Sequence, residues 1–414
     1  MGTLTPRPGG GILQGLRIVE GSAFVAAPLG GMSLAQLGAD VIRFDPINGG
    51  LDHARWPVTA DGRSLFWAGM NKGKRSIAVD FRQPRGQELL TALITAPGAE
   101  AGLFCTNFPA RGWLAYDKLA AQRADLIMVN LLGRHDGGSE VDYTVNPQLG
   151  FPALTGPASS REPVNHVFPA WDAIAGNMIA TALLAALRHR DRTSEGQLVT
   201  LALKDVGLAM LGHLGMIAEA QVNGVDRPRY GNNLYGAFGR DFVTRDGQRA
   251  MVVGLTDMQW GCLLKATGLA EDVARLGESL CVDMNEEGQR FHARDALAAL
   301  FEPWFAERTL AEVRALFDTH RVTWGPYRTV TQALTQDPDL STAHPMFSLL
   351  DQPGIGSYLA PASPLDFSKV PRLPAAPAPL LGQHTDEVLL DVLGLSAATV
   401  GALHDAGIVA GPTT

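Results

Sequence analysis

The residue whose setting best suits chemistry is Asp172, at the start of a helical pattern over residues 171–192. Three basic residues at positions 188–190 fill the last turn of this pattern, a charge arrangement that a helix dipole favours. An aspartate at a helix start can simply cap backbone N–H groups, for about 1 kcal/mol. The same position favours an ionised carboxylate, so Asp172 could also be a nucleophile in a cleft formed with the long loop over residues 133–170.

A dense group of cations lies between residues 72 and 85, where Asp80 is the single acid. The whole chain is acidic, with 34 Lys plus Arg against 42 Asp plus Glu and a net charge of −8. That balance argues against a surface for nucleic acid or anionic membrane. A local cluster could still hold phosphates, although a solvated face around a short strand explains it equally well. The cations are Lys72, Lys74, Arg75, Arg82 and Arg85.

A second candidate group, Asn107, Phe108 and Arg111, directly follows a predicted strand. Ligands of open α/β sheets bind outside the carboxyl ends of the strands, where these side chains would emerge. An amide, an aromatic ring and a guanidinium at that place could hold a purine and a phosphate.

The sequence gives little support for other common enzyme chemistries. The first strand-to-helix turn lacks GxGxxG, and no GxxxxGK[ST] occurs, which weakens a nicotinamide or nucleotide interpretation. Ser33 lies inside a helical pattern, where a core-packing serine is expected rather than a nucleophile. The histidines show no metal-ligand spacing, and the three cysteines, Cys105, Cys262 and Cys281, are too far apart in sequence to indicate a zinc site or disulfide framework.

The elements that must position these residues alternate between strand and helix from residue 16 onward, which favours a mostly parallel sheet covered by helices. The loop over 133–170 breaks the rhythm, and a largely buried helix is expected over 206–220. Strands are predicted at 16–19, 41–44, 76–79, 101–104, 126–131 and 198–203, and helices at 26–37, 84–94, 116–123 and 171–192.

A polar connector over residues 223–233 predicts a domain boundary. Beyond it, a strand pair around Asp246-Gly247 and three helical patterns predict a smaller α+β domain. No segment resembles a secretory signal, and the apolar runs are too short or interrupted, by His213 and Glu219, to span a bilayer. We therefore expect a soluble cytoplasmic protein.

Six segments, in this order, together resemble the successive signatures of the class III CoA-transferases, including the carnitine and formyl-CoA branches. The likeness covers nearly the whole chain. The segments are GLRIVEGSAFVAAPLGGMSLAQLGADVIRFDP, NKGKRSIAVDFRQPRG, TNFPARG, PAWDAIAGNMIATALLAALRHRDRTSEGQLVTLALKD, DRPRYGN and PAPLLGQHTDEVLLDVLGLS.

The resemblance implies a fold and a nucleophile. It implies a Rossmann-like large CoA-binding domain over residues 1–225, completed by 345–414, with a small α+β domain over 226–344, in a homodimer of interlocked rings. It makes Asp172 the catalytic aspartate, which attacks an acyl-CoA thioester to give a mixed anhydride and then an enzyme thioester with CoA. Such chemistry uses a carboxylate with a reference pKa near 3.9 and no general base, consistent with the lack of a Ser/His or Cys/His pair.

Within the family, the runs GSAFVAAPLGGM and GRHDGGSEVDYTVNPQLG resemble a branch that moves CoA between the C1 and C4 carboxylates of one C5 unsaturated dicarboxylic acid. The implied substrate is an acyl-CoA thioester of that acid, and coenzyme A is part of substrate and product rather than a permanent cofactor. The implied pathway is carbon assimilation through 3-hydroxypropionate. The same steps between two molecules would make an intermolecular CoA-transferase, which stays an alternative.

The resemblance also carries CoA contacts onto this chain. It places Phe24 and Val25 along the adenosine or pantetheine path, and the remaining contacts are Arg75 and Arg82 for phosphate, Asn107, Phe108 and Arg111 for the ADP moiety, and Tyr143 near the thioester. The acid that usually follows this tyrosine is Thr144 here, which puts an acidic partner of Asp172 in doubt.

Departures from the family pattern suggest where the free carboxylate binds. Our hypothesis assigns it to Arg134, His135 or Arg240, because arginine suits bidentate carboxylate recognition. Two rival functions remain. An acyl-CoA racemase would need a histidine where this chain has Tyr143, and a non-catalytic CoA-binding protein would have no use for Asp172.

Overall fold

The structure, a computed structural model, describes residues 10–412 and divides into two compact units. The large unit takes the chain up to residue 149, residues 167–217 and everything from 337; the small unit takes 150–166 and 218–336. The predicted boundaries at 225/226 and 344/345 therefore fall at 217/218 and 336/337. Residues 150–166 were assigned to the wrong unit, because a segment without a strand or long helix gives no sign of the unit on which it packs.

The large unit is built on a seven-stranded sheet in the order β12-β3-β2-β1-β4-β5-β6. All neighbours are parallel except β12 and β3. Without β12, this is the doubly wound order with a topological switch between β1 and β4. The predicted α/β class is confirmed. The strands are β1 (Arg17–Gly21), β2 (Asp40–Asp45), β3 (Arg75–Val79), β4 (Leu103–Thr106), β5 (Ile127–Leu132), β6 (Gln197–Ala202) and β12 (Val409–Ala410).

The helices of this unit follow the predicted rhythm with two corrections. The supposed loop over 133–170 contains α5 (Asp142–Gln148) and α6 (Phe151–Leu154), the latter in the small unit. The helix expected over 206–220 is two helices, α8 (Leu203–His213) and α9 (Met216–Asn223), the latter mostly in the small unit, because Gly215 turns the chain with a φ of +74°. The others are α1 (Ala26–Gln36), α2 (Leu65–Met70), α3 (Pro84–Ile94), α4 (Tyr116–Ala120), α7 (Ala170–Thr193), α16 (Thr385–Asp391) and α17 (Ala397–Asp405).

Helix α7 lies directly against α1 because two glycines let their backbones meet. A Cβ on Gly30 would lie 2.9 Å from the carbonyl oxygen of Gly176, and one on Gly176 would lie 2.8 Å from that of Ala26. By length and composition α7 could cross a membrane, the one such helix among residues 10–412. It also packs on β4, β5 and β6, as a core helix of an α/β unit does.

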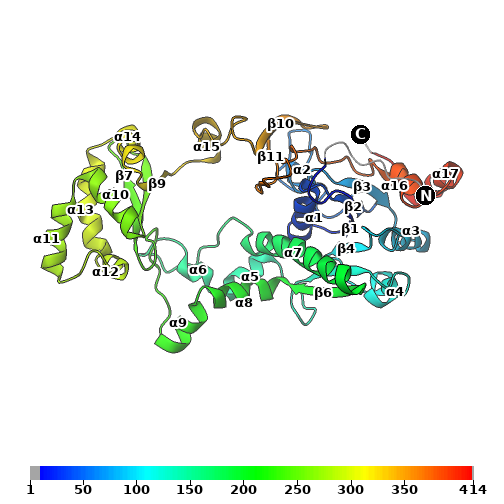
Figure 1. Cartoon of the computed structure of the whole chain (residues 1–414), viewed down its shortest axis with the longest axis horizontal. Helices are drawn as coiled ribbons and strands as arrows, with labels where there is room; N and C mark the ends of the chain where they lie inside the picture. The colour runs from blue at the N-terminus through cyan, green and yellow to red at the C-terminus, as the bar shows by residue number, and fades with distance from the viewer. Residues whose placement is uncertain (1–9, 413–414) are drawn as a thin grey trace. The chain divides into compact units, whose positions relative to one another are not determined.

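The small unit has a three-stranded antiparallel sheet, β7-β8-β9, with helices beside it (Figure 1). Its core is aromatic, with Phe242 and Phe305 stacked at 4.4 Å between ring centroids. Six helices stand between residues 234 and 336, where three patterns were predicted. The elements are β7 (Phe238–Val243), β8 (Arg249–Gly254), α10 (Asp257–Thr267), α11 (Ala270–Leu280), α12 (Glu287–His292), α13 (Arg294–Ala306), α14 (Leu310–His320), β9 (Thr323–Pro326) and α15 (Val330–Gln336). The large unit resumes with the hairpin β10 (Phe347–Gln352) and β11 (Gly356–Pro361).

A buried group of charges, here called the Arg43 cluster, joins β1, β2 and the segments that follow β2. Arg43 is 1% exposed and donates to Asp45 at 2.9 Å, to Asp52 at 2.8 Å and to Asn71 at 3.1 Å. Lys74 donates to Glu20 at 2.7 Å and to Asn71 at 2.9 Å. Charges this deep are stable only when paired. The cluster comprises Glu20, Arg43, Asp45, Asp52, Asn71 and Lys74.

We predict that Arg43→Met lowers the free energy of unfolding by about 3–5 kcal/mol, because it leaves buried carboxylates without their cation. Urea unfolding followed by circular dichroism measures this loss. The matched control is Arg85→Met, which removes an exposed pair with Glu88 and should cost at most about 1 kcal/mol. Equal losses in the two variants would contradict the role of the cluster.

Candidate active site

A cavity of about 580 Å³ lies in the large unit at the carboxyl ends of four sheet strands. Four lining residues come just after these strands: Ala23 after β1, Asn107 after β4, Gly133 after β5 and Leu203 after β6. This is the switch point at which doubly wound sheets bind ligands, and the volume is that of a typical small-molecule site. Five predicted site residues line it together: Phe24, Val25, Asn107, Tyr143 and Asp172.

Asp172 lies in the first turn of α7, and it does not cap the helix. The N-cap position is Pro169, and the carboxylate that accepts the free backbone N–H groups belongs to Asp142. One oxygen of Asp142 accepts from the N–H of Trp171 at 2.8 Å and from that of Asp172 at 3.2 Å. The capping interpretation of Asp172 is therefore wrong, and its side chain is left to line the cavity.

The pKa of Asp172 is raised to about 7, chiefly by burial and next by the nearby negative charge of Asp142. Arg55 acts in the opposite direction. This shift runs against the expectation that the helix start keeps the carboxyl group ionised, because burial and the charge of Asp142 disfavour the ionised form. At neutral pH a large fraction is still ionised, so a nucleophilic carboxylate is available.

The loop after β1 forms a second wall of the cavity. Phe24 adopts a left-handed backbone conformation with a φ of +69°, which a residue with a side chain tolerates only when held. Its N–H donates to Asp52 at 2.9 Å. Asn107 bonds both backbone groups of Ala23, accepting from the N–H at 3.0 Å and donating to the carbonyl at 2.8 Å. Asn107 therefore holds this loop in place, and the Arg43 cluster reaches the cavity through Asp52.

Of the predicted CoA contacts, four lie outside the lining of this cavity. Arg75 is buried and paired with Asp40 and Glu387, whereas Arg82 is exposed and paired with Asp80. Phe108 is partly buried and packs against the core through Phe44 and Phe81, and Arg111 is exposed at the start of a short 3-10 helix, Gly112–Leu114.

The five cations between residues 72 and 85 do not form one surface. Lys74 belongs to the buried Arg43 cluster, and Lys72 donates to the carbonyl of Gly69. Arg85 pairs with Glu88 on the outside of α3. Their density in sequence therefore combines buried and exposed side chains, and a phosphate-binding role for Arg75 and Arg82 stays a prediction.

The three residues proposed to bind the free carboxylate also lie outside the lining of this cavity. Arg134 pairs with Asp136 at 2.7 Å, and His135 lies 3.9 Å from Asp205; neither lines the cavity. Arg240 belongs to β7 of the small unit, with its guanidinium over the ring of Phe242 and 3.9 Å from Glu302. Their role in binding substrate stays a prediction.

The sequence analysis missed four polar residues of this site: Asp52, Arg55, Glu140 and Asp142. A signal was available for two of them. Asp142 stands next to Tyr143, which was singled out, and Arg55 lies in the segment that follows β2, on the side of the sheet where ligands bind.

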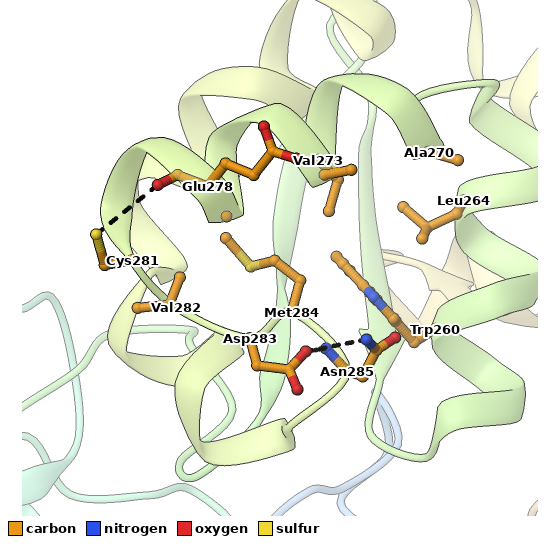
Figure 2. A pocket seen from close by; sticks show the side chains of 12 residues that line it. Trp260, Leu264, Ala270, Val273, Glu278, Cys281, Val282, Asp283, Met284 and Asn285 are labelled. Carbon is orange, nitrogen blue, oxygen red and sulfur yellow. Dashed lines mark hydrogen bonds between the residues drawn. The ribbon is translucent and has the colours of Figure 1, made fainter.

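A second cavity, of about 450 Å³, lies in the small unit (Figure 2). Apolar side chains such as Trp260, Val273 and Met284 form much of its wall. Its polar groups bond one another: Asn285 donates to Asp283 at 2.9 Å, and Cys281 to the carbonyl of Glu278 at 3.8 Å. No basic side chain and no histidine lines it, so the candidate active site is the cavity around Asp172.

Comparison with known proteins shows the family of this chain. Residues 13–385 match the model of CoA-transferase family III, and the chain belongs to that family. It is 72% identical over 403 residues to the 2-methylfumaryl-CoA isomerase of Chloroflexus aurantiacus, covering 97% of this chain and 98% of that protein. It is 28% identical to the succinyl-CoA–D-citramalate CoA-transferase of the same organism, over 96% and 97% of the two chains. A CAIB/BAIF family protein from Brucella suis has the same fold, with a TM-score of 0.75, 26% identity and coverage of 92% and 99%.

We predict that Asp142→Asn lowers the pKa of Asp172, because the amide keeps an oxygen to accept from the α7 backbone but removes the neighbouring negative charge. The shift is partial, since burial is the larger cause and persists. Carboxyl carbon chemical shifts of labelled aspartate, titrated from pH 4 to 9 and assigned with Asp172→Asn, measure it.

The control for this titration is Asp117→Asn, an exposed aspartate in the first turn of α4. It should leave the pKa of Asp172 unchanged. An unchanged pKa in Asp142→Asn would show that the two carboxylates do not interact.

Proposed function

We propose that the protein interconverts 2-methylfumaryl-CoA and 3-methylfumaryl-CoA by moving CoA between the C1 and C4 carboxylates of one dicarboxylate. The observation that carries this proposal is the 72% identity to a 2-methylfumaryl-CoA isomerase over nearly the whole of both chains. The cavity at the switch point, with Asp172 in its wall, supplies a site for the chemistry. Coenzyme A enters and leaves as part of substrate and product, and no resident cofactor is needed.

In the proposed mechanism Asp172 is the nucleophile. A carboxylate oxygen of Asp172 attacks the thioester carbonyl, the C–S bond breaks, and a mixed anhydride and CoA thiolate form. The thiolate then attacks the aspartyl carbonyl, giving an enzyme thioester and the free dicarboxylate. The other carboxylate attacks that thioester, and the released thiolate attacks the new anhydride at the substrate carbonyl. This last step regenerates Asp172, and no proton or water is consumed.

The site residues divide between the two parts of the substrate. Phe24, Val25 and Tyr143 line the cavity and are assigned to the pantetheine and thioester end. The ADP end of CoA is assigned to the surface after β4, where Phe108 and Arg111 stand.

The alternative is an intermolecular transfer between two dicarboxylic acids, and one relative carries the name of such an enzyme, the succinyl-CoA–D-citramalate CoA-transferase. The chemical steps are the same, so retention of the free acid is what separates the two functions. A racemase is disfavoured because Tyr143 stands where the resemblance expects a histidine, and a pure binding protein gives Asp172 no role.

The deciding experiment incubates the purified protein with 2-methylfumaryl-CoA and isotopically labelled free 2-methylfumarate, with mass spectrometry of the product. We expect 3-methylfumaryl-CoA without label, because the same dicarboxylate receives CoA again. Labelled product would make the protein an intermolecular transferase, and absence of product would remove this substrate. As a control, Asp172→Asn should lower turnover by at least about 1000-fold, with circular dichroism unchanged.

We further propose that two copies of the chain associate through α7 and α8. Both helices carry exposed apolar side chains within the large unit, among them Met178 at 39% and Leu208 at 41% exposure, with Leu214 at 64% directly after α8. Exposed apolar side chains on two helices that pack together are typical of an interface between subunits. A cytoplasmic location and a role in assimilation through 3-hydroxypropionate stay predictions from the sequence.

Light scattering coupled to gel filtration tests this association. We expect about twice the chain mass of 44.1 kDa for the unaltered protein, and a shift toward the single-chain mass for Leu208→Glu. Leu349→Glu, at an exposed leucine of β10, is the matched control and should not shift the mass. A single-chain mass for the unaltered protein would refute the dimer.

A further inference from the structure

We propose that Arg55 binds the free carboxylate of the dicarboxylyl-CoA in the cavity that Asp172 also lines; this inference rests on the proposed function. Among residues 10–412, Arg55 is the one cationic side chain in the lining. The other charged groups there are acids: Glu140, Asp142 and Asp172. A substrate with its own carboxylate would meet only repulsion in this cavity without Arg55.

The guanidinium of Arg55 is held by aromatic rings rather than by a carboxylate. Its central carbon lies 5.4 Å from the ring centroid of Phe24 and 5.3 Å from that of Phe66, both in the wall of the cavity. Within residues 10–412, no carboxylate pairs with it and no acceptor takes a hydrogen bond from it. Cation–π contacts leave the N–H edges of a guanidinium free, so Arg55 can still donate two parallel bonds to an incoming carboxylate.

This lack of a partner distinguishes Arg55 from the arginines near it in sequence. Arg43 pairs with Asp45 and Asp52, and Arg63 pairs with Asp61. An arginine that projects into a ligand cavity with its donors free is suited to binding an anion.

The backbone around Arg55 is fixed from inside the protein. Its N–H donates to the carbonyl of Asp52 at 3.2 Å, and its own carbonyl accepts from the hydroxyl of Ser64. Asp52 in turn belongs to the Arg43 cluster and bonds the backbone of Phe24. One buried cluster thus sets the positions of both Arg55 and the ring beneath it, which is the kind of support that a specific binding group requires.

The chemistry of an internal CoA transfer gives Arg55 a particular use. The two isomers differ in which end of the dicarboxylate carries CoA, so a fixed cation in the cavity of Asp172 binds the C4 carboxylate of one and the C1 carboxylate of the other. After the enzyme thioester forms, both ends of the acid are free, and Arg55 is positioned to retain it while the ends exchange. No covalent bond to Arg55 forms in any step.

The test compares two CoA thioesters of equal chain length, succinyl-CoA and butyryl-CoA, which differ in the free carboxylate. Binding is measured by calorimetry in the full chain carrying Asp172→Asn, so that no covalent step follows. We expect this parent to bind succinyl-CoA at least tenfold more tightly than butyryl-CoA. Adding Arg55→Gln should weaken the binding of succinyl-CoA at least tenfold and change the binding of butyryl-CoA less than twofold.

Two further variants make the comparison specific. Arg55→Lys keeps the charge but not the bidentate geometry, and should retain part of the preference for succinyl-CoA. Arg63→Gln, which removes an arginine paired with Asp61 outside this cavity, should retain all of it.

Equal weakening of both thioesters by Arg55→Gln would overturn the proposal, since Arg55 would then support CoA binding or the loop of Phe24. Unchanged binding of both would overturn it too, and the same measurement on Arg134→Gln would then test the site first inferred from sequence. Failure of the proposed function looks different: the unaltered protein would not isomerise 2-methylfumaryl-CoA, whereas the thioester comparison would still report on Arg55.

Discussion

The interaction on which the site depends is the buried contact between Arg43 and the carboxylates around it. Removing these charges from water is costly, and the structure compensates by giving each one a close partner. The cluster does more than hold β1 beside β2. Through Asp52 it fixes the left-handed turn at Phe24 and the start of the segment that carries Arg55. Two walls of the cavity therefore share one internal anchor, and neither can shift without disturbing buried charges.

The wall of the cavity at the start of α7 depends on two carboxylates that have different roles. Asp142 accepts the backbone N–H groups at the start of α7, a task usually performed by a residue of the helix start itself. Asp172 is thereby released for the cavity, and its burial raises its pKa to about 7. A carboxylate of higher pKa is a stronger nucleophile once ionised, and neutral pH still supplies that form. The close contact at Gly30 and Gly176 places this reactive group beside the loop after β1.

Much of this arrangement could be predicted from sequence because period and position carry the information. The strands of the doubly wound sheet follow from alternation, and Asn107 follows from standing just beyond a strand end, whereas Phe24 came from the family resemblance. The positions of charged side chains in the fold could not be predicted in the same way. Lys74 finds its partner in Glu20, 54 residues earlier, so a cation in a basic run was a core residue. Arg55 matters because it lacks a partner, which only the folded chain reveals. Residues 150–166 pack with the small unit, and no local pattern indicates it.

The antiparallel pairing of β12 with β3 has a consequence for biosynthesis. Figure 1 shows α16 close to β3, and Thr385 links Ala78 of β3 to Ala410 of β12. About 330 residues separate the two strands, and the whole small unit is translated between them. At a translation rate of 5–20 residues per second, β12 is synthesised about 15–65 s after β3, and the edge of β3 stays unpaired during that time. During that interval the nascent sheet exposes an unpaired edge, the kind of surface at which strands from different chains associate.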